Sequence, residues 1–81
     1  MSAFDDAVWE AVPPGALPER FAARRDWLLS RVSPGERVLD LGAGDGHFTA
    51  SLTGFGCSVV ALDPSSVAVA RSEGRVSLLS A

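Results

Sequence analysis

The sequence lacks several features that would place it in other classes of protein. It contains a single Cys, which cannot form an internal disulfide, so the chain is not a small secreted domain held together by disulfide bonds. No apolar run approaches the length of about 20 residues that spans a bilayer. The acidic start of the chain also lacks the basic-then-apolar order of a signal peptide. We therefore expect a cytoplasmic globular protein without a membrane partner.

Positive charge is also scarce. The chain has no Lys, and its seven Arg stand against ten Asp and Glu, which gives a net charge of -3. This balance indicates no basic patch for nucleic acid. We expect no metal site either. Hydrophobic residues make up 47% of the chain, too large a share for a disordered protein.

The chain is short for an independent domain. A folded chain of 81 residues buries only about 60% of the surface that it exposes when unfolded, so its stability is marginal. The length therefore raises the question of whether the sequence encodes only part of a larger fold.

The first 33 residues are predicted to be helical. A first helix is expected over Ala3–Val12, with Phe4, Val8 and Ala11 at helical spacing as its apolar face. Pro13-Pro14-Gly15 ends it, and a second helix is expected from about Pro18 to Val32. Pro34 and Gly35 divide this segment, residues 1–33, from residues 34–81.

Residues 34–81 alternate between strand and helix patterns. In order, we expect strand Arg37–Leu41, glycine loop Gly42–Gly46, helix His47–Leu52, strand Cys57–Leu62, helix Ser65–Glu73 with a cap at Gly74, and strand Val76–Leu79. Such alternation predicts an α/β fold with a parallel sheet and right-handed crossovers. The second strand is apolar almost throughout, so it is expected to be buried on both faces. This is part of a Rossmann-like, doubly wound sheet.

The glycine loop and the carboxylates near it carry the chemical information. Gly42, Gly44 and Gly46 allow a sharp turn after the first strand and a close approach of a ligand to the backbone. Asp63 ends the second strand about 20 residues later, a position that faces the ribose of a nucleoside in a Rossmann unit. A plain role as a helix cap before Pro64 stays open for this carboxylate.

The loop does not suit a pyrophosphate. A dinucleotide loop reads Gly-x-Gly-x-x-Gly, but here the third glycine comes one residue early. Asp40 and Asp45 would repel a pyrophosphate, and the loop contains no Arg to compensate. S-adenosylmethionine combines a ribose with a positive sulfonium and ammonium and has no phosphate, so it fits this acidic loop.

The stretch Val38-Leu39-Asp40-Leu41-Gly42-Ala43-Gly44-Asp45-Gly46, followed by Val59-Val60-Ala61-Leu62-Asp63, resembles the class I S-adenosylmethionine-dependent methyltransferases. The resemblance covers roughly residues 17–81, and its specific core is residues 38–63. It implies that Asp40 binds the methionine ammonium and that Asp63 accepts hydrogen bonds from the ribose hydroxyls. It also implies cofactor contacts for the backbone of the loop and for Pro64 beside the adenine, which adds Gly42, Ala43, Gly44, Gly46 and Pro64 to the cofactor-binding residues.

The family implies methyl transfer by in-line attack of a nucleophile on the sulfonium methyl, which depends on positioning. Its fold has about seven strands, whereas this chain reaches the third. We therefore expect a fragment, the N-terminal cofactor-binding portion of a methyltransferase, active only with the missing acceptor-binding half. The catalytic residues are expected beyond Ala81, and the methyl acceptor is not specified. In the family order the first strand is central, so its apolar edge is left unpaired here.

Two other readings stay open for the whole chain. One is a fragment of an NAD(P)-binding Rossmann oxidoreductase. The other is a non-catalytic remnant that binds nothing or associates with itself through the open sheet edge.

Several single residues also allow more than one role. Asp45 is expected to be a solvated loop residue, and Cys57 to be a small residue of the core. Arg24 or Arg25 is either part of a solvated helix face or a partner for the methionine carboxylate. Trp9 either packs in the interior or belongs to a lid that the first helix forms over the cofactor.

Overall fold

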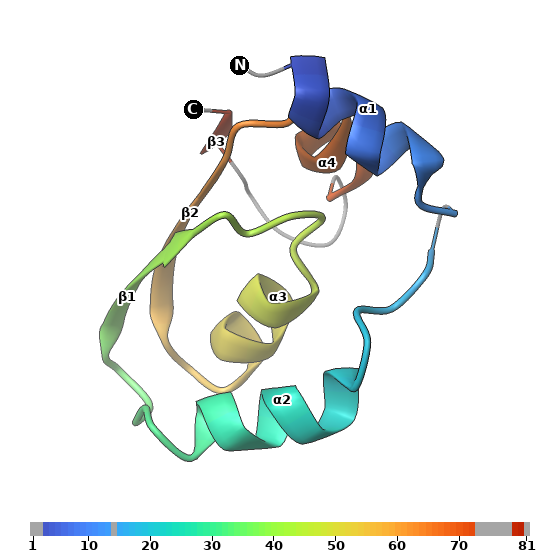
Figure 1. Ribbon diagram of the computed structural model, residues 1–81. Coiled ribbons are helices and arrows are strands. Elements are labelled where there is room, and N and C mark those ends of the chain that lie inside the picture. Colours follow the sequence, from blue (N-terminus) through green and yellow to red (C-terminus); the bar gives the residue numbers. More distant parts are fainter. Residues whose placement is uncertain (1–2, 14, 73–78, 81) are drawn as a thin grey trace.

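The computed structural model in Figure 1 describes residues 3–13, 15–72 and 79–80. Helices and strands alternate along the chain after two initial helices. The elements are α1 (Ala3–Ala11), α2 (Phe21–Leu29), β1 (Arg37–Leu41), α3 (His47–Gly54), β2 (Ser58–Asp63), α4 (Ser66–Arg71) and β3 (Leu79–Ser80). None of the helices in the described ranges has the length and hydrophobicity of a membrane span.

The three strands form one parallel sheet in the order β1-β2-β3. In the register of the first pair, Val38 lies opposite Val59 and Asp40 opposite Ala61. The sheet confirms the predicted partial Rossmann-like α/β fold, and among the described strands it leaves β1 at an open edge. The third strand was expected over Val76–Leu79, but residues 76–78, like the predicted cap at Gly74, lie outside the described residues.

One face of the sheet carries the core. Helix α3 packs against β2, and Leu52 of α3 and Ala61 of β2 are each 2% exposed. Helix α4 contacts β2 as well, and Figure 1 shows the helices on one side of β1 and β2. Both crossovers advance in the same direction across the sheet, and right-handed connections then place their helices on the same face.

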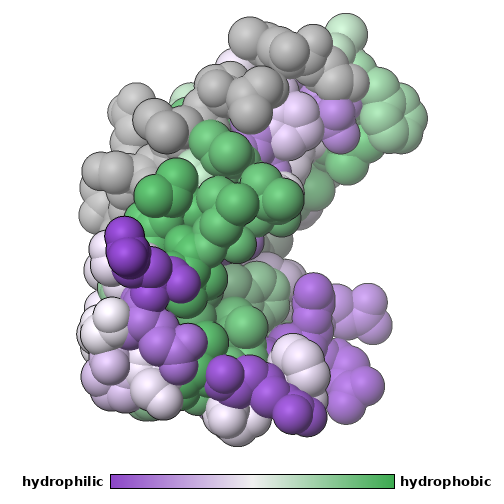
Figure 2. All heavy atoms as spheres, turned by 90° about the vertical axis from the view of Figure 1, so that its left-hand side faces the viewer, coloured by the Kyte–Doolittle hydropathy of each residue, from purple (hydrophilic) through white to green (hydrophobic). Residues whose placement is uncertain are grey.

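The opposite face of the sheet is apolar and open to solvent. Leu39, Leu41 and Val60 are 60%, 69% and 54% exposed. Leu39 and Val60 are partners in the register, so these side chains share one face. Figure 2, which looks at the molecule from the side of β1, shows hydrophobic residues gathered into one surface. The expectation that the second strand is buried on both faces is therefore wrong at Val60.

Helix α1 turns a different face to the protein than its apolar spacing predicts. Phe4 and Val8 are exposed, whereas Trp9 reaches the glycine loop at Gly44 and Asp6 contacts the start of α4. Polar contacts of Asp6 and the large ring of Trp9 therefore decide how this short helix docks.

Helix α2 is shorter than predicted at both ends. Residues before it form a turn in which the Phe21 N–H donates to the Pro18 carbonyl over 3.1 Å. Arg20 has a left-handed backbone with φ 54°, which cannot continue a right-handed helix. The helix packs on α3 through the rings of Phe21 and Phe48, whose centroids are 5.1 Å apart.

Cys57 behaves as the small core residue that the sequence predicts. It is buried immediately before β2, and its thiol donates a weak hydrogen bond to the Ser33 carbonyl over 3.6 Å. Helix α3, which precedes it, extends two residues beyond the predicted end and finishes at Gly54.

Candidate functional site

The glycine loop connects the end of β1 to α3. Gly42, Gly44 and Gly46 have φ angles of 71°, 63° and 86°, a left-handed region that side chains other than glycine adopt at a cost. The N–H groups of Gly42 and Ala43 both donate to the Leu62 carbonyl, over 2.9 and 3.0 Å. These bonds fasten the loop to the carboxyl end of β2, where ligands bind in open α/β sheets.

Asp63 joins the end of β2 to the same loop. Its Oδ2 accepts a hydrogen bond from the Gly44 N–H over 2.7 Å, and its Oδ1 accepts one from the Ser65 N–H over 2.9 Å. The carboxylate is 5% exposed. Charge-assisted bonds of this kind are stronger than those between neutral groups, so Asp63 holds the loop and the start of α4 together.

One alternative from the sequence made Asp63 the cap of the following helix, and the structure shows that it is not. Helix α4 begins at Ser66, and its cap is Ser65, whose Oγ accepts from the Ala68 N–H over 3.2 Å. Pro64 lies immediately before the cap. Ser at a cap position satisfies one free N–H of the helix, which leaves Asp63 to contact the loop.

Asp40 lies near the end of β1, on the face that α3 covers. Its Oδ2 accepts a hydrogen bond from the Thr49 hydroxyl of α3 over 2.7 Å. Thr49 is buried and Asp40 is half-buried. The hydroxyl orients the carboxylate, which still has lone pairs for another donor.

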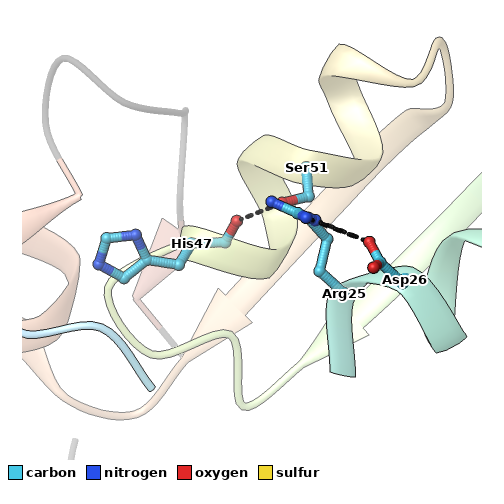
Figure 3. A network of polar contacts seen from close by, with 4 residues as sticks. All are labelled: Arg25, Asp26, His47 and Ser51. Atoms are coloured by element: carbon cyan, nitrogen blue, oxygen red, sulfur yellow. Dashed lines mark hydrogen bonds and ion pairs between the residues drawn. The ribbon is translucent and has the colours of Figure 1, made fainter. Parts of the chain in front are cut away.

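Asp45 is buried, contrary to the expectation of a solvated loop residue. Its Oδ2 lies 3.3 Å from Nε2 of His47 in the first turn of α3. The His47 ring also contacts the Phe21 ring in a T-shaped arrangement, with centroids 5.7 Å apart. Figure 3 shows the imidazole of His47 directed away from Arg25. The backbone carbonyl of His47 accepts a hydrogen bond from the Ser51 hydroxyl over 3.1 Å. The loop is therefore packed around Asp45 and His47.

Two adjoining cavities lie along this loop. The larger, of about 670 Å³, is lined by parts of α2, β1 and α3, and Asp40 is on its wall. The smaller, of about 400 Å³, is lined by Trp9, the segment before α2 and most of the glycine loop. Both volumes fall within the range of small-molecule sites. Arg24, Gly42 and Phe48 line both cavities and mark where they meet.

Some of the predicted cofactor residues line these cavities, and others do not. Asp40 and Gly42 line the larger cavity, and Gly42, Ala43 and Gly44 line the smaller one. Among the described residues, the linings do not include three predicted members, Gly46, Asp63 and Pro64.

Trp9 covers the middle of the glycine loop. A Cβ built at Gly44 would lie 2.7 Å from its ring, so the indole sits directly on the loop backbone. The sequence suggested a lid from this helix as one alternative. Trp9 was the residue named for it, although the apolar spacing of the helix favoured Phe4 and Val8 as the packed face.

Asp6 fixes α1 to the start of α4. Its Oδ1 accepts from the Ser65 hydroxyl over 2.8 Å and from the Val67 N–H over 3.5 Å, and its Oδ2 accepts from the Ser66 hydroxyl over 3.3 Å. The hydrogen bond from Ser65 is the main cause that holds the pKa of Asp6 below its ordinary value. At the other end, Arg71 donates to the Val12 carbonyl over 2.8 Å.

Comparisons with known proteins agree with this geometry. Residues 15–78 match the family described as a methyltransferase domain. A search of curated proteins finds no match. Fourteen chains of solved structures match. One is an S-adenosylmethionine-dependent methyltransferase from Thiobacillus denitrificans in complex with S-adenosylhomocysteine, with 20% identity, a TM-score of 0.64 and coverage of 100% of this chain and 37% of that one.

Two further structures show the same fold. A methyltransferase from Geobacter sulfurreducens, also in complex with S-adenosylhomocysteine, has 23% identity, a TM-score of 0.59 and coverage of 88% of this chain and 32% of that one. YjhP from E. coli has 24% identity, a TM-score of 0.61 and coverage of 96% and 35%. This chain therefore spans about a third of the length of the solved structures that it matches.

Proposed function

Since this chain belongs to the family of methyltransferase domains, we propose that it binds S-adenosylmethionine and provides the cofactor-binding portion of a methyl-transfer enzyme. The observation that supports this most directly is the hydrogen bond from the Gly44 N–H to Asp63 Oδ2 over 2.7 Å. It brings the acidic end of β2 against the glycine loop after β1. Ligands of open α/β sheets bind at the carboxyl ends of the strands, where this contact lies.

The charge around the loop suits this cofactor. Asp40, Asp45 and Asp63 surround a turn that contains no Arg or Lys, so a sulfonium and an ammonium would be attracted where a pyrophosphate would be repelled. When bound, the cofactor would supply an electrophilic methyl group on sulfur. The residues of this chain would bind and orient it, which is the contribution that methyl transfer mainly needs.

The cofactor-binding residues take separate roles in this proposal. Asp40, oriented by Thr49, receives the ammonium, and the backbone of Gly42, Ala43 and Gly44 borders the methionine and ribose. Asp63 accepts from the ribose hydroxyls, because each of its oxygens accepts one N–H and retains a lone pair. Two residues have supporting positions: Gly46 before α3 and Pro64 on the adenine side.

The sheet supports the further proposal that the acceptor-binding half lies outside residues 1–81. Segment 1–33 then covers the cofactor site, and residues 34–81 form the first half of a larger sheet. Further strands would pair with the open edge at β1. The helices that connect those strands would cover the face on which Leu39 and Leu41 are exposed. In the 81-residue chain, the same edge is available for self-association, which gel filtration over a range of concentrations would detect.

Titration calorimetry with S-adenosylmethionine, S-adenosylhomocysteine and NAD tests the cofactor. We expect S-adenosylhomocysteine to bind at least as tightly as S-adenosylmethionine, and NAD not to bind. Tighter binding of NAD would favour an oxidoreductase fragment. A stable dimer that binds none of the three would favour a non-catalytic remnant.

The substitution Asp63→Ala tests the site. We expect it to weaken S-adenosylhomocysteine binding more than about tenfold, because charge-assisted hydrogen bonds are lost. Asp63→Asn keeps the shape and separates loss of charge from loss of packing. Asp26→Ala, on the exposed side of α2, is the control. Circular dichroism verifies folding, and an unchanged affinity in the folded Asp63 variants would remove this residue from the site.

A further inference from the structure

Arg24 of α2 stands where the two cavities meet. With Gly42 and Phe48, it lines both the cavity that contains Asp40 and the cavity formed by the rest of the glycine loop. A ligand that extends along the loop from the Gly44 side to the Asp40 side would pass this side chain. Among the described cavity-lining residues, Arg24 is the cation at this junction.

The guanidinium is held in place without a carboxylate. Its Cζ lies 5.0 Å from the centroid of the Phe48 ring, and Nη1 donates to the Glu19 carbonyl over 3.2 Å. Within the described part of the chain, no Asp or Glu forms an ion pair with it. A guanidinium has five N–H donors, so most remain for a ligand. Stacking on an aromatic ring restricts its orientation and prepares it for an anion.

Arg24 and Asp40 together match an amino-acid head group. Both line the larger cavity, one with positive and one with negative charge. We propose that Arg24 binds the α-carboxylate of the methionine end of the cofactor while Asp40 receives its ammonium. Arg suits this task because its planar donors can bind a carboxylate in a bidentate manner. This inference rests on the proposed function and extends it to the recognition of the amino-acid end.

The neighbouring Arg25 provides a matched control. It lies next along α2 and also stacks on a ring, with its Cζ 5.6 Å from the centroid of Phe21. However, its Nη2 lies 3.1 Å from Asp26 Oδ1, and Figure 3 shows this contact with Asp26. Arg25 is absent from the described linings of both cavities. Removing its charge changes the net charge of α2 without changing the proposed site.

Two ligands that differ at the amino-acid end test the inference. S-adenosylhomocysteine carries the α-carboxylate, and 5′-methylthioadenosine has the same nucleoside thioether without the amino-acid group. We expect Arg24→Ala to weaken S-adenosylhomocysteine binding about tenfold in calorimetry, as loss of a charged hydrogen bond does, and to change 5′-methylthioadenosine binding less than twofold. Arg24→Lys should recover part of the loss, and Arg25→Ala should leave both affinities unchanged.

The outcomes distinguish this inference from the proposed function. If the unaltered chain does not bind S-adenosylhomocysteine, both fail. If it does bind and Arg24→Ala has no effect, or weakens both ligands equally, the assignment of the carboxylate to Arg24 is overturned while the proposed function stands. Arg24→Met keeps an unbranched chain against Phe48 and should match Arg24→Ala. A selective loss in Arg24→Ala alone would show that packing, and not charge, causes it.

Discussion

The two faces of the sheet have opposite surroundings. On one face, Ala61 is buried beneath helices that connect the strands, and Leu52 of α3 is buried with it. On the other face, Leu39, Leu41 and Val60 are more than half exposed. Both crossovers place their helices on the same side because they advance in one direction. An apolar strand such as β2 is therefore not always buried on both faces by the elements next to it in the chain.

This difference also explains where the candidate site can form. Asp40 shares a face with Ala61 and takes its hydroxyl partner from Thr49 of α3. Asp63 binds the loop and the start of α4. The polar groups thus depend on the face that the helices complete. The open face carries apolar residues instead. Exposed apolar patches of this kind are commonly buried against a partner or against a further part of the chain.

The largest expected effect comes from a comparison of two leucine-to-alanine substitutions, one on the covered side of the sheet and one on its open face. Leu52→Ala should lower the free energy of unfolding by about 2–5 kcal/mol, because it creates a cavity in the core. Leu41→Ala should change it by less than about 0.5 kcal/mol, as exposed positions do. Urea denaturation followed by circular dichroism measures both. Equal losses would show that the open face is buried in solution, and gel filtration would then show association.

A smaller effect on the free energy of unfolding is expected from substitutions in the glycine loop, which lies next to the covered side of the sheet. Ala at Gly42 or Gly44 strains a left-handed backbone by about 1–2 kcal/mol. Only Gly44→Ala also displaces the Trp9 ring, since a Cβ at Gly42 meets nothing within 4 Å. We expect Gly44→Ala to cost about 1 kcal/mol more in urea denaturation.

In a Trp9→Ala background, the cost of Gly44→Ala should fall to that of Gly42→Ala, because the displaced ring is gone. If the difference between the two glycine variants persists there, Trp9 is not its cause.

The smallest effect concerns the docking of α1. The hydrogen bonds from Ser65 and Ser66 hold the pKa of Asp6 below its ordinary value of 3.8. This contribution to docking is therefore complete above that value and is lost as the pH falls through the lowered pKa. In a Trp27→Phe variant, Trp9 fluorescence should change with this acid step. Asp6→Asn should remove the step, and a step that remained would belong to another group.

Much of the fold and part of the site are predictable from short stretches of sequence. Strand β1 has the bounds that the pattern predicts, and the glycine loop follows it as expected. These features depend on backbone conformations that glycine permits and on alternation within a few residues. The helix cap was less predictable, because Asp63 and Ser65 are both good cap residues, and the bond from Gly44 decides between them.

The sequence by itself determined the order of the elements and the acidic glycine loop, because these depend on interactions between near neighbours. It also determined the parallel sheet, because alternating strands and helices connect by right-handed crossovers. Only the tertiary structure placed Trp9 on Gly44, buried Asp45 and set Arg24 where two cavities meet. The bond that docks α1 joins Asp6 to Ser65, 59 residues apart. Such contacts depend on where whole helices pack, and local periodicity cannot specify that.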